Sequence, residues 1–331
     1  MTAPDRPARP KVFVTRELTD NVQHRMSELF DAQLNVEDRA LSRSELEVAL
    51  AQADVLVPTI TDRLDADLIA KAGPQLRLIA NFGVGVDHID LHAARARKIL
   101  VTNTPGVLTE DTADMTMALI LSVPRRLGEG EKLIRAGQWG GWKPSGMLGH
   151  RVNGKTLGII GMGRIGRAVA KRAQGFGIRT IYHNRHRLPD GVEAELGARF
   201  VDLDTLFTQS DIISLNCPHT PETHHLVNGH RLSQMRSDAY LVNTARGEVV
   251  DEDALIAALQ AGRIAGAGLD VYVNEPHVDP RLLTLANTVL LPHMGSATYE
   301  GRAAMGERVI ANIRAWVDGL RPPDQVLEGW D

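Results

Sequence analysis

Three stretches in the second half of the sequence each end an apolar run with a side chain that could take part in catalysis. Arg246 follows AYLVNTA, Glu275 follows AGAGLDVYVN, and His293 follows NTVLLP. Because ligands gather beyond the carboxyl ends of strands in open α/β sheets, we expect the three side chains to line one edge of a sheet. The sequence therefore predicts a guanidinium, a carboxylate and an imidazole at one site.

These residue types suit the reduction of a 2-keto acid by hydride transfer. An arginine offers a permanent charge and a planar pair of donors for the substrate carboxylate. A histidine can release a proton near neutral pH, and a neighbouring carboxylate would orient its ring and favour the protonated form. Each type alone is more often structural, so the prediction depends on Arg246, Glu275 and His293 occurring together in a nucleotide-binding protein.

A glycine-rich stretch indicates where the nucleotide would bind. Gly161, Gly163 and Gly166 have the G-x-G-x-x-G spacing, between the apolar run TLGIIG and an alanine-rich helical stretch. In this context the first glycine permits a tight turn, the second lets a pyrophosphate approach the backbone, and the third lets helix and strand pack closely. The helix N-terminus then supplies N–H donors to the phosphates. The alternative is a strand-to-helix turn that binds no ligand.

The next strand candidate, residues 178–184, predicts which dinucleotide is preferred. An NAD site usually has Asp or Glu at the end of this strand, where it accepts hydrogen bonds from the ribose. This sequence has Asn184, Arg185 and Arg187 there instead. A carboxylate would repel a 2′-phosphate, whereas arginines attract one and can bind it in a fork. We therefore predict NADP(H), with NAD(H) as the alternative cofactor and a solvated basic loop as the structural alternative.

The elements that must position these residues alternate along the whole chain. Apolar runs separated by helical stretches indicate parallel sheets with crossover helices, and two such series predict two lobes with the active cleft between them. Residues 109–137 form one helical region interrupted at Pro124, and residues 296–319 form a helix after the last strand. The strand candidates are residues 11–15, 54–59, 76–81, 99–103, 156–161, 178–184, 211–217, 239–245, 265–272 and 287–293.

The composition argues against several other classes of protein. The 331 residues are 43% hydrophobic and 24% charged, which is typical of a globular protein. A net charge of −4 gives no general attraction to nucleic acid or to an anionic membrane. Cys217 is the one cysteine, and the N-terminal stretch lacks the apolar core of a signal peptide, so we expect a cytoplasmic location. The histidines of HRHR and HHLVNGH match no familiar zinc spacing, so no metal site is predicted.

Four motifs carry a resemblance to a known family. GMGRIG, NTARGEVVDEDAL, GAGLDVYVNEP and LLPHMGSAT resemble motifs of the D-isomer-specific 2-hydroxyacid dehydrogenases, and the similarity extends from NFGVGVDHID to the last helix. The resemblance implies that Arg246, Glu275 and His293 are catalytic. It also implies an α/β fold of two Rossmann-like lobes with parallel sheets. The nucleotide-binding lobe (residues 105–295) would be inserted into a flavodoxin-like substrate-binding lobe (residues 1–104 and 296–331).

Within the family, the basic strand end and GQWGGWKP are most similar to the glyoxylate/hydroxypyruvate reductases, and this implies further contacts. Backbone N–H groups of Val84 and Gly85 would bind the substrate carboxylate, although a simple strand-exit turn explains these residues equally well. Trp142 would border the partner's substrate pocket in a homodimer, although packing in a loop would also explain it. Cys217 would be a packing residue beside the adenosine rather than a nucleophile. The other expected cofactor contacts are Thr112, Arg164, Ile165, Pro218, Thr223, Thr244, Ala245 and Asp270.

The sequence as a whole predicts an NADPH-dependent oxidoreductase acting on a CH–OH group. The predicted reaction is the reduction of glyoxylate and hydroxypyruvate to glycolate and D-glycerate. One alternative is a dehydrogenase of another small D-2-hydroxy acid, and a second is a non-catalytic dinucleotide-sensing protein of the same fold. Phosphoglycerate dehydrogenase is less favoured, because the basic loop argues for a reductase. Formate and phosphite dehydrogenases are less favoured on the family resemblance.

Overall fold

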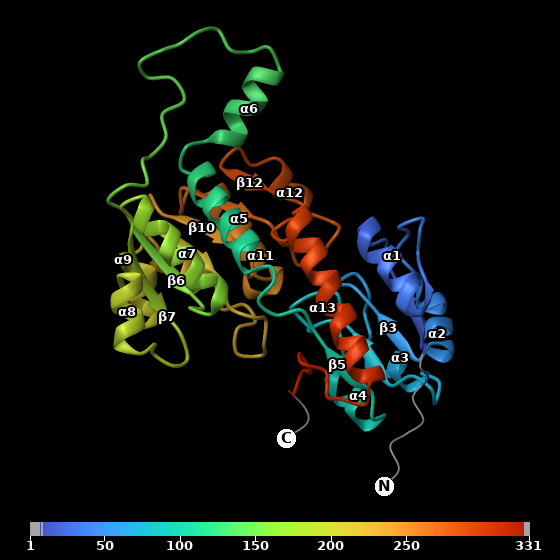
Figure 1. Cartoon of the computed structure of the whole chain (residues 1–331). Helices are drawn as coiled ribbons and strands as arrows, with labels where there is room; N and C mark the ends of the chain where they lie inside the picture. Colours follow the sequence, from blue (N-terminus) through green and yellow to red (C-terminus); the bar gives the residue numbers. More distant parts are fainter. Residues whose placement is uncertain (1–6, 8, 328–331) are drawn as a thin grey trace. The chain divides into compact units, whose positions relative to one another are not determined.

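The chain folds into two α/β units, both drawn in Figure 1. The computed structural model describes residue 7 and residues 9–327. Met1–Leu108 and Ala297–Asp331 form one unit, here called the terminal unit, and Thr109–Ser296 form the other, the central unit. In the described residues each unit has one sheet, and every neighbouring pair of strands is parallel. The predicted α/β fold, with one lobe inserted into the other, is confirmed.

The terminal unit has a five-stranded sheet with the strand order β2-β1-β3-β4-β5. This 2-1-3-4-5 order is that of flavodoxin-like sheets. The strands are β1 (Lys11–Val14), β2 (Asp31–Gln33), β3 (Val55–Val57), β4 (Leu78–Ala80) and β5 (Leu100–Thr102). The helices are α1 (Asp20–Leu29), α2 (Arg43–Gln52), α3 (Ala66–Ala70), α4 (Leu91–Ala96) and α13 (Tyr299–Val317).

The alternation of side chains along each strand divides the core of the terminal unit into two layers. Val55 and Val57 of β3 belong to an apolar cluster that includes residues of α1 and α13. Leu56, between them, belongs to a second cluster that includes residues of α2, α3 and α4. Helices therefore cover both faces, which is why the inner strands β3 and β4 are apolar and buried at every position.

The central unit has a seven-stranded sheet with the strand order β12-β11-β10-β9-β6-β7-β8. The strands are β6 (Thr156–Ile160), β7 (Arg179–His183), β8 (Ala198–Phe200), β9 (Ile212–Leu215), β10 (Tyr240–Asn243), β11 (Gly266–Leu269) and β12 (Thr288–Leu290). The helices are α5 (Thr109–Ser122), α6 (Leu127–Arg135), α7 (Arg164–Gly175), α8 (Asp190–Leu196), α9 (Leu203–Gln209), α10 (Gly229–Gln234), α11 (Glu252–Gln260) and α12 (Pro280–Leu283), with a 3₁₀ turn η1 (Gly247–Val249).

Small residues bring the helices of the central unit close to its sheet. A Cβ atom on Gly268 of β11 would lie only 2.9 Å from Val123 and 3.2 Å from Leu119, so glycine lets the region of α5 approach this strand. Along α7 the buried positions are Gly166, Val169, Ala170 and Ala173, which recur at helical spacing and form one face.

The observed elements agree with the predicted ones except at two short strands. β2 and β8 were not among the candidates, because each has three residues, lies at an edge of its sheet and shows no continuous apolar run. The predicted interruption at Pro124 is confirmed, since α5 ends at Ser122 and α6 begins at Leu127. The boundaries between the units lie at residues 108/109 and 296/297, close to the predicted boundaries at 104/105 and 295/296. No described helix has both the length and the apolar character needed to cross a membrane.

A glycine at the contact between α1 and α13 generates a stability prediction. A Cβ atom on Gly306 of α13 would collide with the side chain of Val22, whose β-branched shape leaves it few ways to move. Replacing Gly306 by alanine gains about 1 kcal/mol of helix propensity, but overpacking costs about 1–3 kcal/mol. We therefore expect Gly306→Ala to lower the free energy of unfolding in a denaturant titration.

Gly175→Ala in α7 is the matched control for this substitution. A Cβ atom on Gly175 would meet nothing within 4 Å, so alanine there should be neutral or stabilising. If Gly306→Ala proves as stable as Gly175→Ala, the close approach of α1 and α13 is wrong.

Candidate active site

The strand order of the central unit reverses between β6 and β9. The chain adds β7 and β8 on one side of β6, and then returns to build β9 to β12 on the other side. Nucleotides bind beyond the carboxyl ends of the strands at such a reversal. Gly161 directly follows β6, and Asn216 and Cys217 follow β9, so the predicted glycine loop lies at the reversal.

The three glycines of this loop have different surroundings. Gly161 has a φ of +95°, and a Cβ atom there would lie 2.5 Å from the backbone nitrogen of Cys217, so only glycine fits. A Cβ atom on Gly166 would collide with the carbonyl oxygen of Gly161, so this glycine lets α7 pack against the turn. A Cβ atom on Gly163 would meet nothing within 4 Å. No packing among the described residues requires glycine at 163, which fits the close approach of a pyrophosphate.

The start of α7 offers hydrogen-bond donors beside the glycine loop. Gly163 is the N-cap, and no side chain caps the helix. The first N–H groups, including those of Arg164 and Ile165, have no acceptor within the helix, and such helix ends bind phosphate groups. Asn184, at the end of β7, supports the loop, because its Oδ1 accepts a hydrogen bond from the N–H of Met162 at 3.1 Å. These residues fit the diphosphate of a dinucleotide.

The two arginines of the basic loop have different surroundings. Arg187 donates to Glu193 of α8 from Nε at 3.0 Å and from Nη2 at 2.6 Å, and it also pairs with Asp190 at 3.1 Å. The side chain of Arg185 is exposed and forms no hydrogen bond or ion pair in the part of the chain that the structure describes. The sequence pattern does not distinguish the two arginines. In the structure, Arg187 is paired with carboxylates and Arg185 is not.

The expected contacts on the adenosine side follow β9. Burial raises the pKa of the Cys217 thiol to about 11, so the thiol is neutral at physiological pH. A buried neutral thiol agrees with the predicted packing role and argues against a nucleophile. Thr223 Oγ1 donates to the carbonyl of Pro218 at 2.7 Å, which closes the turn that these residues form.

Thr244 and Ala245 lie just beyond β10, in a segment that Asn243 holds in shape. Asn243 Nδ2 donates to the carbonyl of Arg246 at 2.8 Å, and its Oδ1 accepts from the N–H of Ala245 at 3.0 Å. The hydroxyl of Thr244 lies 2.7 Å from that of Thr116 in α5. The strand end is therefore fixed both by its own side chain and by the helix that covers it.

Asp270, directly after β11, anchors the loop that contains His293. Its two carboxylate oxygens accept hydrogen bonds from the N–H groups of Met294 and Gly295, both at 2.8 Å. Burial raises the pKa of Asp270, which is 1% exposed. A Cβ atom on Gly295 would lie 3.5 Å from the methyl group of Thr112, so α5 also approaches this loop. Sequence reasoning assigned Asp270 to the cofactor and missed the anchoring role; an aspartate at a strand end was the available signal.

Glu275 and His293 are in direct contact. Nδ1 of His293 lies 2.6 Å from Glu275 Oε2, and Glu275 Oε1 accepts from the N–H of Tyr272 at 3.0 Å. Burial raises the pKa of Glu275, but the hydrogen bond and charge of His293, the N–H of Tyr272 and the charge of Arg246 together lower that pKa below its usual value. Glu275 is thus a carboxylate at neutral pH. It occupies the Nδ1 side of the imidazole, and Nε2 forms no hydrogen bond within the described residues.

The backbone of His293 is left-handed, with a φ of +52°. Left-handed backbone is uncommon outside glycine, although histidine adopts it more readily than most residues, and such positions cluster at functional sites. The surrounding hydrogen bonds of Asp270 and Glu275 hold this conformation in place.

Arg246 reaches the same edge of the sheet from the end of β10. A Cβ atom on Gly247 would collide with the carbonyl group of Tyr272, so the two strand-end segments touch. Nη1 of Arg246 donates to the carbonyl of Ala245 at 2.8 Å, and its charge contributes to lowering the pKa of Glu275. Because β10, β11 and β12 are neighbours, the cation, the carboxylate and the imidazole come from adjacent strand ends.

Val84 and Gly85, the predicted carboxylate-binding residues, belong to the loop after β4 in the terminal unit. Asn103 Nδ2 donates to the carbonyl of Val84 at 2.8 Å, and Asn81 Nδ2 donates to that of Gly85 at 2.9 Å. Within the described chain the N–H groups of Val84 and Gly85 donate no hydrogen bond. A turn whose carbonyl groups already accept hydrogen bonds, and whose N–H groups have no acceptor, is suited to binding an anion. The two asparagines carry no signal in the sequence alone.

Trp142 lies in a segment with little packing of its own. Helix α6 has no buried residue, and the loop that follows it projects from the central unit in Figure 1. The side chain of Trp142 is 81% exposed, and Trp139 and Leu148 are exposed as well. The alternative explanation, packing in a loop, therefore does not account for Trp142 among the described residues.

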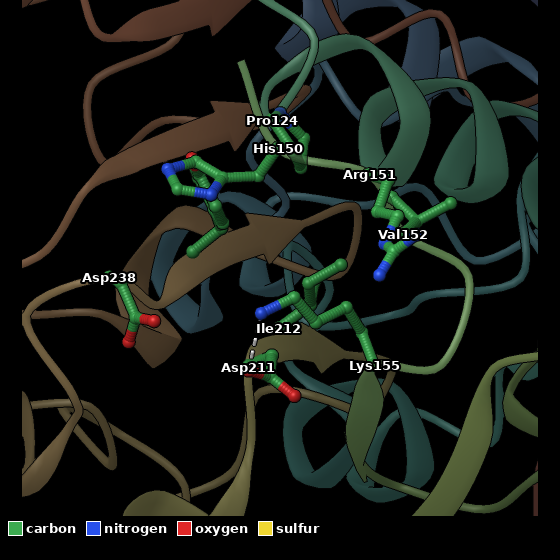
Figure 2. Close-up of a pocket in the computed structure, with 9 residues that line it drawn as sticks. Pro124, His150, Arg151, Val152, Lys155, Asp211, Ile212 and Asp238 are labelled. Carbon is green, nitrogen blue, oxygen red and sulfur yellow. Dashed lines mark hydrogen bonds and ion pairs between the residues drawn. The ribbon is translucent and has the colours of Figure 1, made fainter.

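A small cavity lies at the opposite, amino end of the sheet, between the side chains of Figure 2. Lys155, Asp211 and Asp238, which precede β6, β9 and β10, line it together with His150, and Lys155 pairs with Asp211 at 3.1 Å. Its volume is about 10 Å³, room for one water molecule. It is too small for a keto acid and lies away from His293.

Comparisons with known proteins agree with this geometry. Residues 117–295 match the family model described as the NAD binding domain of D-isomer specific 2-hydroxyacid dehydrogenase. A glyoxylate reductase of Thermococcus litoralis is 46% identical over 322 residues, which cover 96% of this chain and 97% of that protein.

Solved structures give the same result. A glyoxylate reductase from Paecilomyes thermophila is 35% identical, with a TM-score of 0.86 over 97% of this chain and 99% of that one. An NADPH-dependent glyoxylate/hydroxypyruvate reductase from Sinorhizobium meliloti, in complex with NADP and malonate, is 36% identical, with a TM-score of 0.85 over 97% of this chain and 98% of that one. The chain therefore belongs to the D-isomer specific 2-hydroxyacid dehydrogenases, NAD(P)-dependent oxidoreductases that act on a CH–OH group.

Proposed function

We propose that the protein is an NADPH-dependent reductase of glyoxylate and hydroxypyruvate, which forms glycolate and D-glycerate. The observation that carries this proposal is the 2.6 Å contact between His293 and Glu275, on strand ends adjacent to that of Arg246. The relatives named glyoxylate reductase support a small 2-keto acid as substrate. A single cysteine, buried and neutral, suits the reducing cytoplasm as the place of action.

The residues of the site divide the chemistry between them. The bound nicotinamide would supply the hydride for C2 of the keto acid. Arg246 holds the substrate carboxylate and polarises the carbonyl group. His293, protonated, donates from Nε2 to the substrate oxygen as negative charge develops there, and Glu275 holds the ring through Nδ1 and favours its cationic form.

The preference for NADPH follows from the charge at the end of β7. Asn184 stands where an NAD site usually has an acidic residue, so no carboxylate repels a 2′-phosphate. Arg185 is exposed and forms no ion pair with a described residue, so its charge and donors are available to a phosphate. The solved Sinorhizobium meliloti relative with NADP supports this choice.

A homodimer explains the exposed segment around Trp142. The apolar side chains of Trp139, Trp142 and Leu148 are each more than half exposed in the central unit. Burying them against a second copy of the chain would remove this apolar surface from water. Trp142 would then border the substrate pocket of the partner subunit.

The first prediction tests the cofactor and the substrate class. Arg185→Ala should raise KM for NADPH about tenfold or more with little effect on KM for NADH, because a hydrogen bond to a charged group contributes about 1.5–3 kcal/mol. The measurement is steady-state oxidation of both dinucleotides by wild type and variant, with glyoxylate, hydroxypyruvate and pyruvate.

Arg199→Ala is the matched control, since it removes another exposed arginine, from the neighbouring strand β8. It should change neither KM. An equal loss for the two dinucleotides in Arg185→Ala would contradict the assignment of Arg185. Dinucleotide binding without turnover of any keto acid would favour the sensing alternative.

The second prediction concerns the proton donor. Since the pKa of Glu275 is held below its usual value, Glu275 stays charged across neutral pH and activity at high pH depends on the proton of His293. Glu275→Gln keeps a hydrogen-bonding group but loses the charge that favours the cationic ring. The basic limb of the pH profile of kcat/KM for reduction should therefore move to lower pH.

His293→Ala serves as the reference for complete loss of the donor, with kcat lowered by roughly 10²–10⁴. Its remaining activity should lack the basic limb. If the limb of Glu275→Gln stays in place or moves to higher pH, Glu275 is not the electrostatic partner of His293.

The third prediction concerns association. Trp142→Ala should change the ratio of kcat/KM for hydroxypyruvate and glyoxylate, with KM for NADPH unchanged, because Trp142 would contact the substrate pocket and not the dinucleotide. Sedimentation velocity should give a dimer for the wild type. Only monomer at assay concentration would exclude the dimer.

A further inference from the structure

A buried tyrosine and an ion pair hold the basic loop that follows β7. Tyr182 of β7 is fully buried, and its hydroxyl donates to Glu193 Oε1 at 2.7 Å. The same hydroxyl accepts a hydrogen bond from the N–H of Leu188 at 2.8 Å. Arg187 donates to both oxygens of Glu193, at 3.0 and 2.6 Å. One strand residue, one helix residue and two loop residues therefore form a single connected network.

The carboxylate at the centre of the network has charged and hydrogen-bonding partners, which stabilise it in its buried position. Glu193 is buried apart from 9% of its surface, and a buried carboxylate needs charged or hydrogen-bonding partners. The hydrogen bonds of Arg187 and Tyr182 supply them and lower the pKa of Glu193 to about 2. Two parallel N–H···O bonds between a guanidinium and a carboxylate define orientation as well as contact. Both Arg187 and Glu193 are thus charged and oriented at neutral pH.

The network has a consequence for the loop. Residues 184–189 connect β7 to α8, and the hydrogen bonds fix this connection at Arg187 and Leu188. Asn184, at its start, is tied to the glycine loop through Met162. Arg185 lies between these two anchored points, and its own side chain forms no hydrogen bond or ion pair with a described residue, although its charge contributes to lowering the pKa of Glu222. The backbone on both sides of Arg185 is therefore held, while its guanidinium is not.

We propose that Tyr182, Glu193 and Arg187 are positioning residues that shape this loop, and that they thereby hold Arg185, assigned above to the 2′-phosphate of NADPH, in place. The proposal rests on the proposed function, because it assigns roles within the preference for NADPH. Arg187 contributes to that preference through Glu193 and the loop, without contacting the phosphate. Although the loop contains two arginines, only Arg185 would therefore contact the cofactor.

Glu193→Gln separates this role for Arg187 from a direct contact with the phosphate. If Arg187 contacted the phosphate, releasing it from Glu193 would leave NADPH affinity equal or greater. If Arg187 acts through Glu193, losing the charge and one acceptor oxygen of the carboxylate weakens the anchor of the loop, and NADPH affinity falls. The two assignments thus predict effects of opposite sign, and removing the carboxylate charge leaves Arg187 half-exposed in water rather than buried and unpaired.

The experiment is titration of the full-length protein with NADPH and with NADH, followed by fluorescence, for wild type, Glu193→Gln and Tyr182→Phe. We expect both variants to weaken NADPH about threefold or more and to lower the ratio of NADPH to NADH affinity. A general loss of stability would weaken both dinucleotides and leave the ratio unchanged. An unchanged or increased ratio in Glu193→Gln overturns the proposal.

A double-mutant cycle gives an independent test of the two arginines. Arg187→Ala should weaken NADPH in the wild type but add little in the Arg185→Ala background, since it acts through Arg185. Equal effects in both backgrounds would show that Arg187 contributes separately, and would also overturn the proposal.

Hydrogen exchange distinguishes failure of this proposal from failure of the proposed function. The amide of Leu188 should exchange faster in Glu193→Gln and Tyr182→Phe than in wild type, whichever dinucleotide is preferred. A wild type that binds NADPH and NADH equally, with this amide protected as expected, would refute the NADPH preference and leave the anchored loop intact. Unchanged exchange at Leu188 in both variants would refute the positioning role itself.

Discussion

Two carboxylates behind the loop of residues 293–295 are the constraint on which the geometry of the candidate active site depends. Asp270 binds two consecutive backbone N–H groups of this loop, and Glu275 binds the imidazole of His293 and the N–H of Tyr272. These bonds hold His293 in a left-handed backbone conformation that a flexible loop would leave. The imidazole ring is therefore oriented by hydrogen bonds to backbone and side chain together.

The parallel sheet explains how few elements are needed to build such a site. Adjacent strands β10, β11 and β12 end at the same edge, so residues that are distant in the sequence become neighbours without long loops. The glycine loop lies at the same edge, where the strand order reverses at β6. Close packing supports both, because Gly161, Gly166 and Gly247 each lie where a side chain would strike the neighbouring backbone.

Much of this arrangement could be predicted from the sequence, because continuous apolar runs mark strands buried on both faces and because Arg246, Glu275 and His293 each follow such a run. The strands β2 and β8 could not, since an edge strand of three residues has too little buried surface to leave a pattern. The partner of Arg187 could not either, because Glu193 is six residues away across a loop and a helix start, a spacing with no regular geometry. The anchoring by Asp270 and the asparagines around Val84 and Gly85 likewise depend on how loops turn, which residue types alone do not specify.

Helix α13 has a consequence for the order in which the chain acquires its structure during synthesis. Met305, Val309, Ile313 and Trp316 of this helix share one apolar cluster with residues of β1, β3 and α1. The first hundred residues therefore leave the ribosome without the helix that covers one face of their sheet, whereas every strand and helix of the central unit has been made by residue 296. The central unit can therefore complete its core before residues 299–317 are synthesised. Until then, the terminal unit has apolar surface that no helix covers. This reverses the usual N-terminal-first order of domain folding, and the apolar surface left uncovered in the meantime is prone to aggregation.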